Sequence, residues 1–151
     1  MSTWWERSAG FSSVFLRLAL GISFLSAVTD RFGWWGAFGQ PNVSWGDFAR
    51  FVDYTGKLIW FLPHAAITPL AVLATGAEIL LGLLLLAGWQ TRIAALCSGI
   101  LLMTFGLAMT LALGIKSPLN FSVFSAAGGS LLLATCTAFP LSVDEYEGGK
   151  Q

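Results

Sequence analysis

The chain has 151 residues, of which 56% are hydrophobic and only 11% are charged, and its mean hydropathy is +0.73. Because soluble domains carry about 25% charged residues, this composition predicts an integral membrane protein. Eight basic and eight acidic residues give a net charge of zero, which excludes a basic nucleic-acid surface. Two cysteines without CxxC spacing and a single histidine exclude a disulfide framework, a zinc ribbon and paired histidine ligands for haem.

The first apolar stretch covers residues 11–30 and contains one charge, Arg17. Arg7 precedes the stretch as in a signal peptide, but Arg17 interrupts the apolar run and no A-x-A cleavage site follows it. We therefore expect a retained first transmembrane helix.

The long loop after this span, residues 32–66, contains a predicted amphipathic helix over about 45–62. Ser44 and Asp47 have capping-box-like spacing, and Pro63 marks the end of the pattern. Apolar residues recur at helical intervals: Phe48, Phe51, Val52, Thr55, Leu58, Ile59 and Leu62. Two positions fit this pattern, one flat on the lipid headgroups and one as a lid over the mouth of a helix bundle.

Three more apolar stretches, at about 67–88, 93–114 and 119–141, have the roughly 20 residues that a span needs. Their connections are short, so the chain is predicted to be an all-α membrane protein with an antiparallel four-helix bundle. Tryptophans at both ends of the spans indicate aromatic belts at the two membrane interfaces. Lys and Arg are divided equally between the two sides, so charge alone does not orient the chain.

Glu78 is an unusual residue for the middle of the second span, since a charge at the bilayer centre costs roughly 2.5–3.5 kcal/mol on insertion scales. Small residues share its helix face, which predicts that Glu78 points into the bundle. From depth along the helices we expect Arg17 to be its partner, with Arg92 completing an Arg–Glu–Arg cluster. Asp30 and Arg31 lie at the far end of the first helix, close to the face of Arg17.

This predicted polar cluster has two interpretations. It is either a structural ion pair that fixes helix register, or a functional site that handles a proton or orients a quinone or another amphiphile. His64 and Asn120 are further candidates at the outer mouth of the bundle. We expect no metal site, and no cofactor held by the chain other than a candidate quinone.

The sequences "LRLALGISFL" and "DRFG" on the first helix, with "AEILLGLLLLAGWQTRIAAL" on the second and third, resemble the DoxX family. The discriminating residues are Arg17, Gly21, Glu78, Gly82, Gly88 and Arg92. Family members often carry a lysine near the end of the first helix, where this chain has Arg31. The resemblance therefore does not extend to chemistry that requires this lysine.

The resemblance implies a multi-pass protein of a prokaryotic cytoplasmic membrane, with both termini inside and the long loop outside. The family takes its name from the membrane subunit of a thiosulfate:quinone oxidoreductase. The implied function is that of a membrane subunit of a redox complex for thiosulfate or thiol oxidation coupled to quinone. Its partners would be the lipid bilayer and other membrane or outer-face subunits, and a homo-oligomer is also compatible. The alternative is a non-catalytic accessory subunit that stabilises a larger membrane complex.

Overall fold

The computed structural model describes residues 4–148, and within this range the chain is helical and contains no strand. Three helices are long and apolar enough to cross a membrane: α1 over its Ser8–Arg31 part, α3 and α4. The prediction of an all-α membrane protein is therefore confirmed. The helices are α1 (Trp4–Arg31), α2 (Phe48–Leu58), α3 (His64–Ala87), α4 (Thr91–Leu113), α5 (Lys116–Asn120), α6 (Val123–Thr135) and α7 (Val143–Gly148).

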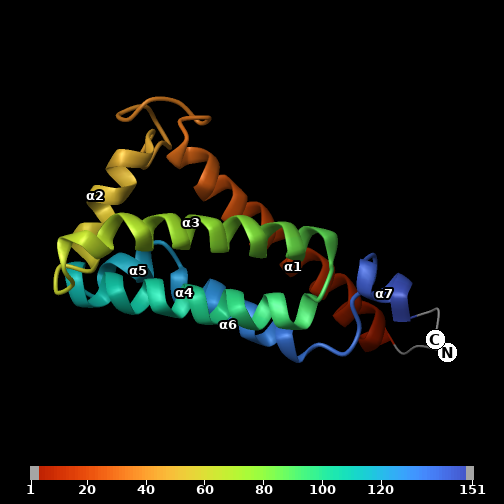
Figure 1. The fold of residues 1–151 in the computed structure, drawn as a ribbon. Coiled ribbons are helices and arrows are strands. Elements are labelled where there is room, and N and C mark those ends of the chain that lie inside the picture. The colour runs from red at the N-terminus through yellow and green to blue at the C-terminus, as the bar shows by residue number, and fades with distance from the viewer. Residues whose placement is uncertain (1–3, 149–151) are drawn as a thin grey trace.

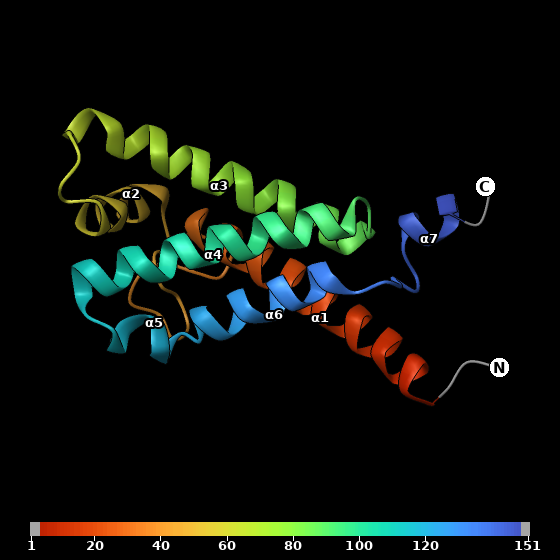
Figure 2. The ribbon, with the colours of Figure 1, turned by 90° about the horizontal axis from the view of Figure 1, so that it is seen from below.

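The helices form one elongated bundle (Figure 1). The long helices α3 and α4 run antiparallel, α6 packs chiefly against α4, and α1 crosses α3 diagonally. The view from below shows α2 beside the first half of α3, with α7 at the opposite end of the molecule (Figure 2). The start of α1 lies at the same end as α7.

Glycines allow α1 and α3 to approach closely. A Cβ atom on Gly21 would lie 3.0 Å from the carbonyl oxygen of Gly82, and a Cβ on Gly82 would lie 3.2 Å from the carbonyl oxygen of Gly21. Lipid provides no hydrophobic driving force for helix association, so membrane helices associate through close packing, which small residues at the crossing allow. The adjoining core contains Leu20, Phe24, Leu81, Leu85 and Leu133.

The fourth predicted span, residues 119–141, is not one helix in the structure. The chain turns between α5 and α6, where Ser122 has a φ of 54°, and it leaves the helix at Cys136, which is extended. The 13 residues of α6 rise only about 20 Å, which is short of the roughly 30 Å hydrocarbon layer. Residues 136–142 then connect α6 to α7 at the end of the bundle where α1 starts.

The predicted amphipathic helix is confirmed as α2, although it is shorter than the expected 45–62. Asp47, not Ser44, caps it, because its side chain accepts a hydrogen bond from the backbone N–H of Arg50 at 2.9 Å. This hydrogen bond lowers the pKa of the Asp47 carboxyl below its usual value. Within α2, burial raises the pKa of Tyr54.

Candidate functional site

Glu78 points into the bundle as predicted, and its side chain is paired with Arg31. Glu78 Oε2 lies 2.6 Å from Arg31 Nη1, and the two side chains are only 4% and 3% exposed. The same Arg31 nitrogen donates a hydrogen bond to Thr75 Oγ1 at 2.8 Å. Thr75 lies three residues before Glu78, so it occupies the same helix face. One guanidinium group therefore joins the end of α1 to the middle of α3.

Aromatic residues from the loop and from α2 cover this ion pair. Arg31 Cζ lies 3.6 Å from the ring centroid of Phe51 and 5.3 Å from that of Trp45. The two rings pack edge to face, with centroids 5.3 Å apart, and Phe51 is buried. A cation held over aromatic faces in this way gains about 2 kcal/mol when water is excluded. The α2 helix thus closes the Arg31–Glu78 pair off from the end of the bundle.

Asp30 fixes the loop that presents Trp45. Its buried carboxylate accepts hydrogen bonds at Oδ2 from the backbone N–H groups of Ser44, at 2.9 Å, and Trp45, at 3.2 Å. Two buried polar atoms beside the pair have no hydrogen-bond partner among the described residues, namely Asp30 Oδ1 and Arg31 Nε. We call Asp30, Arg31, Thr75 and Glu78, with Trp45 and Phe51 over them, the Arg31–Glu78 site.

The predicted Arg17–Glu78–Arg92 cluster is wrong. Arg17 lies beside Gly88, ten residues and about 15 Å along α3 from Glu78. Helical side chains lean toward the N-terminus of their own helix, so Arg17 leans away from Glu78, whereas Arg31 leans toward it. Arg17 is buried and donates hydrogen bonds to the carbonyl oxygen of Leu141 at 2.6 Å and to that of Pro140 at 3.4 Å.

The other predicted site residues lie elsewhere. Arg92 is exposed and donates to the carbonyl oxygen of Cys136 at 3.0 Å. His64 lines a separate groove between α2 and α3. Asn120 is exposed at the end of α5. No hydrogen bond or ion pair within residues 4–148 joins these three side chains to the Arg31–Glu78 site.

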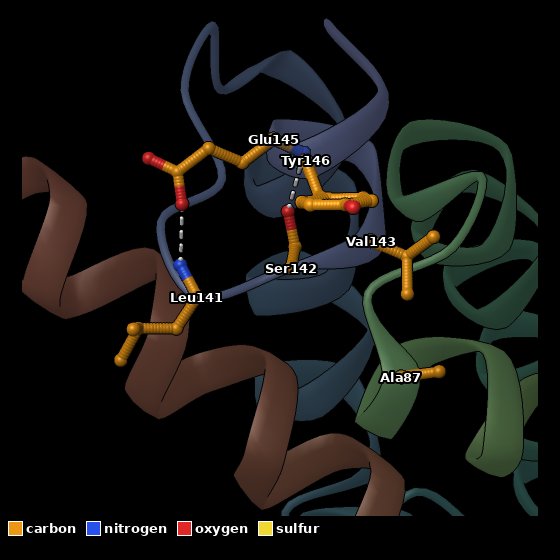
Figure 3. Close-up of a pocket in the computed structure, with 6 residues that line it drawn as sticks. All are labelled: Ala87, Leu141, Ser142, Val143, Glu145 and Tyr146. Atoms are coloured by element: carbon orange, nitrogen blue, oxygen red, sulfur yellow. Dashed lines mark hydrogen bonds between the residues drawn. The ribbon is translucent and has the colours of Figure 1, made fainter. Parts of the chain in front are cut away.

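An open pocket of about 550 Å³ lies at the opposite end of the bundle, where the C-terminal segment packs on the α3–α4 turn (Figure 3). The side chain of Asp144 accepts hydrogen bonds from the backbone N–H groups of Gln90 and Thr91, both at 2.8 Å. It therefore caps α4 from 53 residues away. The pocket is lined by Ala87, Leu141, Ser142, Val143, Glu145 and Tyr146.

Sequence reasoning missed the aromatic cover and the role of Thr75. Both had a signal: Thr75 shares the face of Glu78, and Phe51 lies on the apolar face of α2. What was missing was the position of α2 relative to Arg31, which depends on the path of residues 32–47.

Comparison with known families adds a decisive finding. Residues 12–114, which are 103 of the 151 residues, match the family model of DoxX. The chain belongs to the DoxX family. The DoxX match includes Arg31 and Glu78, and it ends before α5, α6 and α7. No curated protein and no solved structure matches the chain significantly.

Proposed function

We propose that this DoxX chain is the membrane subunit of a redox complex that passes electrons from a thiosulfate or thiol donor to quinone. The observation that supports the proposal is the buried Arg31–Glu78 pair inside a membrane helix bundle. Ionisable residues at such positions are costly and commonly mark proton, ion or substrate sites. The family's namesake subunit belongs to a thiosulfate:quinone oxidoreductase, which supplies the reaction class.

The residues of the Arg31–Glu78 site have donors and surfaces that suit a quinone headgroup. Arg31 Nε is a buried N–H donor without a partner, and a quinone carbonyl oxygen is an acceptor. A bound quinone would supply an acceptor of two electrons and two protons. Arg31 would hold a carbonyl oxygen, Glu78 would exchange a proton at its carboxylate, and Trp45 and Phe51 would exclude water.

Entry to the site requires α2 to move, because Phe51 covers Arg31 directly. The sequence contains no CxxC motif and no nucleotide-binding glycine loop. In this proposal, electrons from the donor therefore arrive through a partner subunit, and the chain supplies the membrane side of the reaction.

The test uses the double variant Arg31→Met/Glu78→Leu, which removes both charges and leaves neither partner unpaired. The full-length protein is purified in mild detergent and titrated with decylubiquinone, and quenching of tryptophan fluorescence is followed, because Trp45 lies at the site. We expect saturable quenching for the wild type and its loss in the double variant at unchanged helix content. The control is Arg50→Met/Asp47→Asn, which removes an exposed ion pair.

Equal quenching in the wild type and the double variant would refute the proposed site. The accessory function makes a different prediction. If the double variant binds decylubiquinone normally but loses partner subunits in native mass spectrometry of the membrane extract, the pair serves assembly and not quinone chemistry.

A further inference from the structure

A groove of about 260 Å³ lies between α2 and the start of α3, at the end of the bundle away from α7. A Cβ atom on Gly56 would lie 3.2 Å from Ile67 Cδ1, so this glycine allows α2 to sit close to α3. Four of the lining side chains are polar and exposed. The lining residues are Val52, Asp53, Gly56, Lys57, His64, Ile67 and Thr68.

The charges in this groove are not used by the fold. Asp53 and Lys57 are four residues apart on α2, a spacing at which such side chains often pair. Within residues 4–148, however, neither side chain takes part in an ion pair or a hydrogen bond, and neither does that of His64. The groove therefore presents a cation and a carboxylate together.

The start of α3 adds hydrogen-bond donors to the same groove. Pro63 occupies the N-cap position and provides no side-chain cap, and only the N–H of Ala66 is satisfied, by the Pro63 carbonyl at 2.8 Å. The backbone N–H groups of His64 and Ala65 remain without an acceptor at the positive end of the helix dipole. Together with Lys57, they form an environment that favours an anionic oxygen group.

The position of the groove indicates a lipid as the ligand. Trp60 and Phe61, immediately before α3, are 71% and 58% exposed, as is typical of aromatic residues at a membrane interface. The same side of α3 continues from Thr68 as an apolar stripe at helical spacing. This stripe contains Val72, Ile79 and Leu83, which are 54%, 37% and 53% exposed. The groove thus opens at headgroup level onto a surface suited to an acyl chain.

We propose that this groove binds the headgroup of a phospholipid that carries a primary ammonium, as phosphatidylethanolamine does. Lys57, His64 and the free N–H groups of α3 bind the phosphate. Asp53 accepts hydrogen bonds from the ammonium. One acyl chain lies along Val72 and Leu83. This assignment accounts for both unpaired charges, whereas a simple anion would leave the carboxylate of Asp53 opposed to it.

The proposal is tested by native mass spectrometry of the delipidated full-length protein with added lipids. The lipids are phosphatidylethanolamine, phosphatidylcholine, whose ammonium has no N–H, and phosphatidylglycerol, which has no ammonium. We expect phosphatidylethanolamine to bind about tenfold more tightly than the other two, as one charge-assisted hydrogen bond allows. Asp53→Asn removes this preference, and Lys57→Gln weakens binding of all three lipids about tenfold.

The matched control is Lys116→Gln, since Lys116 is an exposed lysine on α5 outside the groove. It should leave lipid binding unchanged. The proposal is overturned if Lys57→Gln binds lipid like the wild type, or if the three lipids bind equally. Inorganic phosphate that competes as strongly as phosphatidylethanolamine at the same concentration would also overturn it, because the groove would then be a simple anion site.

Discussion

The substitution Glu78→Gln leaves the Arg31 guanidinium buried without its carboxylate. The two side chains are 4% and 3% exposed, so solvent cannot replace the lost partner. Breaking a buried ion pair by removing one member costs about 3–5 kcal/mol of folding free energy. We expect this loss for Glu78→Gln, because arginine cannot shed its proton to relieve the burial.

The double variant Arg31→Met/Glu78→Leu should be more stable than Glu78→Gln. Replacing both charges by apolar groups of similar volume is often neutral, but this variant also loses the contact of Arg31 with Phe51, worth about 2 kcal/mol. Subtracting this loss from the cost of about 3–5 kcal/mol for Glu78→Gln, we expect the double variant to be about 1–3 kcal/mol more stable than Glu78→Gln.

The assay is reversible unfolding in mixed micelles with increasing sodium dodecyl sulfate, followed by far-ultraviolet circular dichroism. The exposed pair of Asp47 and Arg50, 2.9 Å apart with side chains about half exposed, is the control. Arg50→Met should cost no more than about 2 kcal/mol, since it removes this exposed pair and the contact of Arg50 Cζ with the ring of Phe38, 3.9 Å away. A loss from Glu78→Gln as small as that of the control, or a double variant no more stable than Glu78→Gln, would refute the reasoning.

Three other contacts lead to separate predictions. Asp144→Ala removes both hydrogen bonds to the start of α4 and should cost about 1–2 kcal/mol in the same assay, most of which Asp144→Asn should restore. Because the folded pKa of Asp47 is lowered, its cap should stabilise α2 above about pH 4. This stabilisation should be lost as the pH falls through the folded pKa. Amide hydrogen exchange in α2 measures this effect, and Asp47→Ala should remove it. Gly21→Ala should cost about 1–3 kcal/mol through crowding of Gly82, whereas Gly76→Ala, with open space around it, should stabilise α3 by up to about 1 kcal/mol.

The long helices could be predicted from the sequence because each depends on local features. Apolar runs of sufficient length identified α1, α3 and α4, and helical periodicity before Pro63 identified α2. The prediction of a fourth span over residues 119–141 was wrong, because the sequence stays apolar beyond Thr135, where α6 ends. There, a distant residue satisfies the backbone: Arg17 binds the carbonyl groups of Pro140 and Leu141. Irregular backbone is tolerated at membrane depth when protein groups supply its hydrogen bonds.

The direction of Glu78 could also be predicted, because the small residues on its face are visible in the sequence. Its partner could not be found by comparing depths alone, since Arg17 and Arg31 are 14 residues apart on nearly the same face of α1. The crossing at Gly21 and Gly82 fixes the antiparallel register. Side-chain direction then selects Arg31, because helical side chains lean toward the N-terminus of their helix.

The two arginines of α1 therefore have different chemical surroundings. Arg17 donates its hydrogen bonds to backbone carbonyl oxygens and interacts only at longer range with the carboxylates of Asp144 and Glu145, so it supports the irregular C-terminal segment. Arg31 is held by a carboxylate, and only a carboxylate can take up or release a proton beside it. Of the two, only Arg31 has a carboxylate at ion-pair distance, and in the proposed function charge and proton transfer would be coupled there. That end of the bundle also has the aromatic cover whose movement would admit a ligand. In the proposed function, proton handling and ligand access would both depend on α2, and substitutions in the C-terminal segment should alter stability without altering quinone binding.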